Sequence, residues 1–83
     1  MNNKLDKLIT SIEGEIKKPD FYPYLPEILE ILNLMRITTE ADKERKTKLI
    51  GGLMRLVTED FEFSESVLGT EILEVANQYY ESL

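Results

Sequence analysis

Two short segments of the chain gather the residues whose types could support chemistry. One is DFYPYLP, residues 20–26, and the other is EDFEFSES, residues 59–66. Between them they hold five of the seven aromatic residues and five carboxylates: Phe21, Tyr22, Tyr24, Phe61, Phe63, Asp20, Glu59, Asp60, Glu62 and Glu65. Aromatic rings anchor protein interfaces, and carboxylates around them select a basic partner. The chemistry that these residue types favour is binding.

Catalysis is disfavoured by what the sequence lacks. The chain contains no histidine and no cysteine. The usual nucleophile–base pairs and the side chain that exchanges protons near neutral pH are therefore missing. A pair of carboxylates could still act as acid and base, but a domain this small has little room for an apolar cleft around them. We expect a noncatalytic protein that needs no cofactor.

The acidic segment 59–66 also raises the question of a calcium site. A twelve-residue EF-hand frame that starts at Asp60 places Val67 at position 8 and Glu71 at position 12, as such a loop requires. Position 6, however, is Glu65, where the sharp turn needs glycine. These acids are better explained as solvated residues at helix ends, so no metal site is predicted.

The charge is unevenly distributed along the chain. The net charge is −6, which argues against nonspecific binding to nucleic acid or anionic lipid. Residues 59–83 carry seven acids and no base, whereas six of the ten bases lie in residues 36–58. A nucleic-acid-associated regulator that uses the basic stretch Lys43–Lys48 is the alternative function, although interleaved acids at i,i+4 spacing are more typical of a self-paired, solvated helix face.

The elements that must position these residues are helices. Apolar residues recur at i, i+3, i+4 and i+7 in four stretches, which predicts an all-α domain with helices at about 3–18, 24–38, 40–58 and 65–82. The second stretch is apolar over most of its circumference, so we expect it to lie at the centre of the core, covered on several sides. Thr39 and Asp42 suit a capping box for the third helix. Gly51 and Gly52 mark either a break in that helix or a close approach of another backbone, and we favour a continuous helix.

Short connections between four helices predict a small antiparallel bundle with up-down-up-down topology, folded as one domain over residues 1–83. In that topology the first and third connections lie at the same end. Residues 20–24 and 59–65 would then form one surface, the acidic-aromatic pole.

The pole has two interpretations. The rings could plug the open end of the bundle, because each buries a large apolar area. Alternatively, Phe21 and Phe63 plug the end while the other rings stay partly exposed and bind a protein with a basic surface. The second interpretation describes a small inhibitor, immunity-type or regulatory binder, with the contact residues Tyr22, Tyr24, Asp60, Phe61 and Glu62.

Three further expectations concern assembly and location. The surplus apolar face of the second helix and the aromatic end with Tyr79, Tyr80 and Leu83 would permit a homodimer, while packing of that end on its own core is the alternative. The longest apolar runs are too short to span a membrane, and no export signal is recognisable. Together with the absence of cysteine, this favours the cytoplasm.

Overall fold

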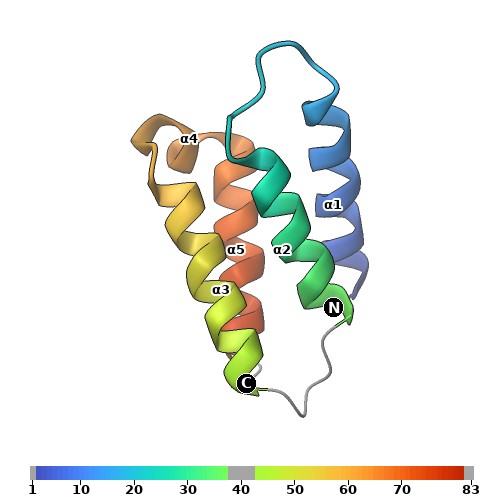
Figure 1. Ribbon diagram of the computed structural model, residues 1–83, viewed down its shortest axis with the longest axis vertical. Coiled ribbons are helices and arrows are strands. Elements are labelled where there is room, and N and C mark those ends of the chain that lie inside the picture. Colours follow the sequence, from blue (N-terminus) through green and yellow to red (C-terminus); the bar gives the residue numbers. More distant parts are fainter. Residues whose placement is uncertain (1, 38–42, 82–83) are drawn as a thin grey trace.

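The computed structural model describes residues 2–37 and 43–81, and all the regular structure in these two ranges is helical (Figure 1). This confirms the all-α expectation. The elements are α1 (Asn2–Ile16), α2 (Leu25–Ile37), α3 (Lys43–Thr58), α4 (Phe61–Glu65) and α5 (Val67–Glu81). The predicted capping box at Thr39 and Asp42 lies outside the described residues, as does Leu83.

The four long helices pack side by side. α1 packs against α2, α2 against α3, α3 against α5, and α5 returns to α1. Figure 1 shows each long helix running opposite to the one before it, with the α1–α2 connection and α4 at the same end of the molecule.

The expectation that the second helix lies at the centre is wrong. Within the described residues, α2 packs against α1 and α3, whereas α5 packs against α1, α3 and α4. Helices placed around a shared core each bury one face, so none of them has to be covered on all sides. The outer face of α2 is accordingly only partly covered: Leu29 and Leu34 are half-buried, and Ile37 at the C-terminal end is 71% exposed.

The core is built from the predicted stripes and is almost entirely aliphatic. The interaction that holds these helices together is therefore burial of apolar side chains, worth roughly 1.5–3 kcal/mol for each fully buried residue. The buried hydrophobic residues are Leu5, Leu8, Ile9, Ile12, Leu25, Ile28, Leu32, Met35, Ile50, Leu53, Val57, Ile72, Val75, Ala76 and Tyr79.

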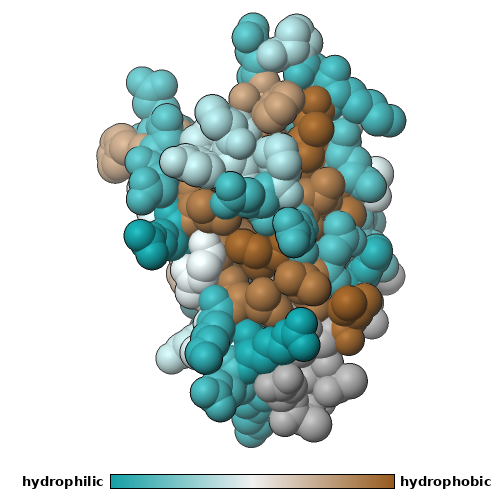
Figure 2. Space-filling view, viewed as in Figure 1, coloured by the Kyte–Doolittle hydropathy of each residue, from teal (hydrophilic) through white to brown (hydrophobic). Residues whose placement is uncertain are grey.

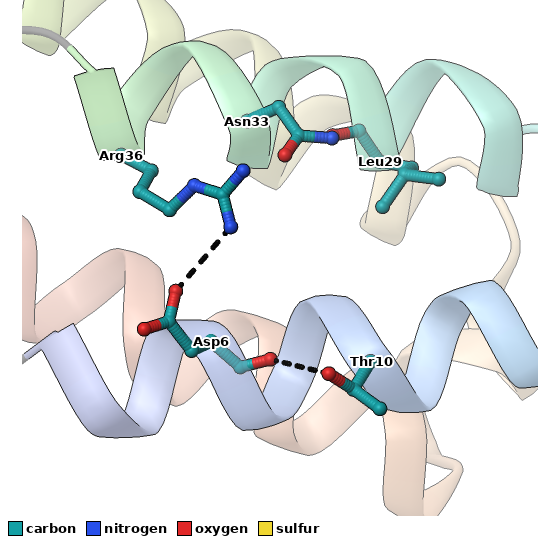
Figure 3. Close-up of polar contacts among 5 residues, drawn as sticks. All are labelled: Asp6, Thr10, Leu29, Asn33 and Arg36. Carbon is teal, nitrogen blue, oxygen red and sulfur yellow. Dashed lines mark hydrogen bonds and ion pairs between the residues drawn. The ribbon is translucent and has the colours of Figure 1, made fainter.

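An exposed ion pair crosses the seam between α1 and α2. Arg36 Nη1 lies 3.5 Å from Asp6 Oδ1, while Asn33 Nδ2 donates within α2 to the carbonyl of Leu29 (Figure 3). The side chains of Arg36 and Asp6 are both about half exposed. Exposed ion pairs contribute only about 0–1 kcal/mol, so this contact adds little to the stability of the helix pair.

The third helix passes through its two glycines without interruption, as expected. A Cβ atom on Gly51 would meet no described atom within 4 Å, and one on Gly52 would meet only the Cδ1 atom of Ile31, at 3.8 Å. That distance is an ordinary van der Waals contact. Neither a break nor a close backbone approach therefore explains the pair.

The segment that the sequence assigns to a connection contains a fifth helix. Asp60 caps α4: its Oδ1 accepts the backbone N–H of Phe63 at 3.2 Å, and its carbonyl accepts the N–H of Ser64 at 3.0 Å. A five-residue helix is shorter than the window in which a 3.6-residue period can be recognised. The last long helix begins at residue 67 instead of 65, because Ser66 ends α4 and caps α5.

Within the described ranges, no helix combines the length and the apolar character that crossing a bilayer requires.

Candidate functional site: the acidic-aromatic pole

Two segments that are forty residues apart in sequence meet at the acidic-aromatic pole. The rings of Tyr22 and Phe63 stack with their centroids 3.9 Å apart and their planes 6° from parallel. Tyr24 lies edge-on to Tyr22, with ring centroids 5.6 Å apart. These contacts bring the α1–α2 connection against α4, as the sequence-based topology requires.

Tyr22 has a structural role in this arrangement. Its hydroxyl donates a 2.7 Å hydrogen bond to the carbonyl of Leu56. That carbonyl belongs to the last turn of α3, where it has no amide within its own helix to pair with. Tyr22 thereby satisfies the C-terminal end of α3 from another part of the chain, and its hydroxyl proton is already used in doing so.

The environment of the Tyr22 hydroxyl also affects its acidity. Burial raises the pKa of this group above its ordinary value, and the negative charge of Asp60 raises it further. The neutral hydroxyl is therefore the form that the fold stabilises.

Gly69 allows α4 to lie directly against the start of α5. A Cβ atom at this position would overlap the carbonyl oxygen of Phe63 and would lie 2.9 Å from its carbonyl carbon. Ser66 completes the junction, because its Oγ accepts the N–H of Gly69 at 3.0 Å and its own N–H donates to the carbonyl of Phe63. The position of α4 is thus fixed by backbone contact and hydrogen bonds as well as by ring stacking.

The side chains on the other side of α4 face solvent. Phe61 is 72% exposed, and Asp60 and Glu62 on either side of it are exposed as well. Tyr24 is 39% exposed. Of the five predicted contact residues, four are therefore accessible, and only Tyr22 is used mainly for packing.

Phe21 and Phe63 are half-buried and pack against the core. The two interpretations of the pole thus apply to different residues: three rings, those of Phe21, Tyr22 and Phe63, close the end of the core, and two, those of Tyr24 and Phe61, remain accessible.

Tyr24 also borders a shallow groove between α2 and α3. The groove has a volume of about 320 Å³ and is floored by Ile31, Gly52 and Leu56, with Arg55 and Glu59 at its edge. Figure 2 shows hydrophobic side chains gathered in the middle of the face on which α2 and α3 lie, with hydrophilic residues around them. An apolar surface therefore extends from the pole along this face.

The basic stretch Lys43–Lys48 is less available than its sequence suggests. Lys46 is buried, with its Nζ atom 5.8 Å from the centroid of the Tyr79 ring, and Lys48 lies 3.9 Å from Glu44. The buried stem of Lys46 covers apolar surface at the end of the core. Three of the four bases in this stretch are thus exposed, and one of them, Lys48, lies near an acid.

Two residues hold the pole together, Ser66 as a cap and Gly69 as a contact. The sequence predicts Ser64 or Ser66 as the cap of the last helix, and the structure confirms Ser66. The contact at Gly69 was missed, because the sequence marks this glycine only as an uncertainty in the start of that helix. The spacing of these two residues was a signal for this contact. A serine that caps a helix, followed three residues later by glycine, places the glycine in the first turn of that helix.

The residues of the calcium-loop frame, 60–71, form α4 and the start of α5. No group of three metal-ligating side chains occurs among the described residues.

Comparison of the chain with protein-family models, with curated proteins and with solved structures finds no match.

Proposed function

We propose that this chain is a noncatalytic protein-interaction module that binds a partner with a basic surface through the acidic-aromatic pole. The observation that carries this proposal is Phe61, an aromatic ring 72% exposed between two carboxylates on a helix whose position is fixed. A large apolar ring on a helix whose backbone is already fixed buries much area on binding without any need to order the helix.

The charge around the ring specifies the kind of partner. Asp60 and Glu62 flank Phe61 in sequence, and residues 59–83 contain no base. Carboxylates at the rim of an apolar anchor accelerate encounter with a basic surface and disfavour acidic ones. The partner is therefore a protein with lysine or arginine residues around an apolar pocket.

The antiparallel four-helix bundle with up-down-up-down topology belongs to this proposal, with α4 as an addition to its third connection. Such a bundle places the ends of α1 and α3 together, which is what forms one pole from two segments. The pairwise packing of the long helices and the Tyr22–Phe63 stack support it.

No specific observation favours nucleic acid as the ligand, because Lys46 is buried and Lys48 lies near Glu44. A homodimer remains a prediction. It would use Tyr80, which is exposed on α5, or the open face of α2.

The test is affinity capture, from an extract of the native host, with purified chain as bait. The informative bait is Phe61→Ala combined with Glu62→Lys, because both side chains are exposed and the cap residue Asp60 is left intact. A matched control is Ile37→Ala, which removes an equally exposed apolar side chain at the far end of α2.

We expect the unmodified chain and the control to retain a basic protein whose recovery falls when the salt concentration is raised from about 50 to 500 mM. The double variant should lose that protein while its circular dichroism is unchanged. Recovery of the same protein by the double variant would exclude the pole as the contact surface.

A further inference from the structure

A groove lies on the inner side of the pole, on the opposite side of α4 from Phe61. It has a volume of about 550 Å³ and lies between α1, the α1–α2 connection and the start of α5. Pockets that take specific ligands or anchor side chains commonly measure about 300–1,000 Å³. The α1–α5 seam is the least extensive of the four seams between long helices, which explains why the groove opens there.

The interior of the groove is apolar and aromatic. Phe21, Tyr22 and Phe63 line it together with Leu25 and Leu68. These residues are half-buried or buried, and the Tyr22–Phe63 stack and the hydrogen bond from Tyr22 to Leu56 hold two of the rings in place. The floor is thus rigid before any ligand arrives, which lowers the entropic cost of binding.

The mouth of the groove is acidic. Glu15, Asp20 and Glu71 are the charged residues that line it, and no lysine or arginine is found among its described lining residues. Lys18 reaches Glu15 from outside, with Nζ 2.8 Å from Oε1, in an exposed pair that a second cation could replace at little cost. An apolar floor beneath three carboxylates is complementary to a cationic amphipathic ligand.

Val67 strengthens this assignment. It is the first residue of α5, it lines the groove, and it is 79% exposed. An apolar β-branched side chain there extends the apolar surface of the groove to its edge.

We propose that this groove receives a basic amphipathic segment of the partner protein, with an apolar side chain on the aromatic floor and lysine or arginine residues at Glu15, Asp20 and Glu71. This inference rests on the proposed function and adds a second contact, since the groove and Phe61 lie on opposite sides of α4. The adjoining groove of about 370 Å³ between α1 and α5 is lined by Lys4 and Lys7 as well as by acids, so it does not extend the acidic mouth. The basic residues of the segment therefore lie over the first groove.

The experiment uses the full chain labelled with ¹⁵N and a defined probe. The probe is an amphipathic helical peptide made only of leucine and lysine, about 14 residues long so that it spans about 20 Å. Two control peptides separate the contributions: one replaces every leucine by serine and keeps the charge, and the other replaces every lysine by glutamate. Binding is followed by fluorescence anisotropy, and the site is located by amide chemical shifts.

Three variants test the site. Glu71→Lys and Val67→Lys each place a cation at the mouth, and both residues are exposed, so the fold is retained. Glu13→Lys is the matched control: it makes the same charge change on the opposite face of α1 from Ser11 and Glu15, outside the lining.

We expect shifts at the lining residues of α1, the connection and α5. Affinity for the leucine–lysine peptide should fall about tenfold or more in Glu71→Lys and Val67→Lys, but less than about threefold in Glu13→Lys. The serine and glutamate peptides should bind at least about tenfold more weakly than the probe.

Other results overturn the inference. Equal losses in Glu71→Lys and Glu13→Lys would show a diffuse charge effect with no groove. Shifts confined to Tyr24 and residues 59–62 would remove the groove but leave the proposed pole standing. Absence of binding at peptide concentrations of about 1 mM would exclude a basic segment in this groove. The capture experiment with Phe61→Ala and Glu62→Lys would still decide the proposed function separately.

Discussion

The two sides of α4 carry a phenylalanine each, and the environments of these rings are opposite. Phe63 stacks on Tyr22 and packs against the core, while Phe61 is almost three-quarters exposed. Residues i and i+2 of a helix point to different sides, so one short helix can hold itself to the core with one ring and present the other. The contacts of Phe63 with the core therefore determine where Phe61 is placed on the surface. A binding surface at Phe61 depends on the packing of α4 against the rest of the fold.

The largest effect is expected where the backbone of α4 touches α5. Gly69→Ala places a methyl group on the carbonyl of Phe63, which must move and take the stacked ring with it. We expect a loss of about 3 kcal/mol in the free energy of unfolding, measured by urea denaturation. A loss below about 0.5 kcal/mol would show that α4 can shift at little cost. The packing of Phe63 would then not fix the position of Phe61.

The two phenylalanines allow a direct test of the contrast. Phe63→Ala removes a half-buried, stacked ring and should lower the free energy of unfolding by about 2–3 kcal/mol. Phe61→Ala should change it by less than about 0.5 kcal/mol, because the ring is exposed. Thermal and urea unfolding of the two variants, side by side, give the comparison. Similar losses for both would mean that Phe61 also packs in the folded protein.

Tyr22→Phe separates the two contacts of Tyr22, because it removes the hydrogen bond to Leu56 and keeps the ring stacked on Phe63. We expect a loss of about 1 kcal/mol at pH 7, because the carbonyl of Leu56 loses its partner.

The same variant gives a pH signature. Folding raises the pKa of the Tyr22 hydroxyl from its ordinary value of 10.0, so the stability that it contributes is present below that pH and is lost as the pH rises above it. Tyr22→Phe should therefore show a shallower loss of stability between pH 9 and about 11 than the unmodified chain does. An unchanged slope would assign the alkaline loss to other tyrosines, such as Tyr79, whose pKa is also raised, chiefly by burial.

A small gain in stability is expected at a glycine that contrasts with Gly69. Gly51 lies inside α3 with open space where a Cβ atom would be. Gly51→Ala should raise the free energy of unfolding by about 0.5–1 kcal/mol, since alanine favours the helix and meets no obstruction. A decrease in the free energy of unfolding would contradict the open space found at Gly51.

Much of the fold follows from sequence periodicity because the core is aliphatic and each long helix buries one stripe. Leu5, Ile12, Leu32 and Ile72, for example, lie on predicted stripes and are completely buried. Periodicity reports which side of a helix is inward, but not which helices are its neighbours. The second helix was therefore placed at the centre because it is the most apolar, whereas its outer residue Ile37 is exposed.

The candidate site was predictable as a location and less so in its details. Composition and chain direction indicate that residues 20–24 and 59–65 share one end, and the Tyr22–Phe63 stack brings them together. The expectation that Phe63 plugs the end while Phe61 stays exposed agrees with the burial of the two rings. The sequence did not separate Tyr22 from Tyr24, which are the same residue type in the same segment. Burial of a particular ring depends on its neighbours in space, which a local pattern does not contain.

The sequence by itself determined the residue types at the pole, the helical stripes and the acidic C-terminal third, because these depend on local spacing and composition. Only the tertiary structure decided that Tyr22 completes the end of α3, that Gly69 admits α4, and that a groove opens beside Phe63. Each of these depends on two segments far apart along the chain, and their distance is set by packing of the whole core.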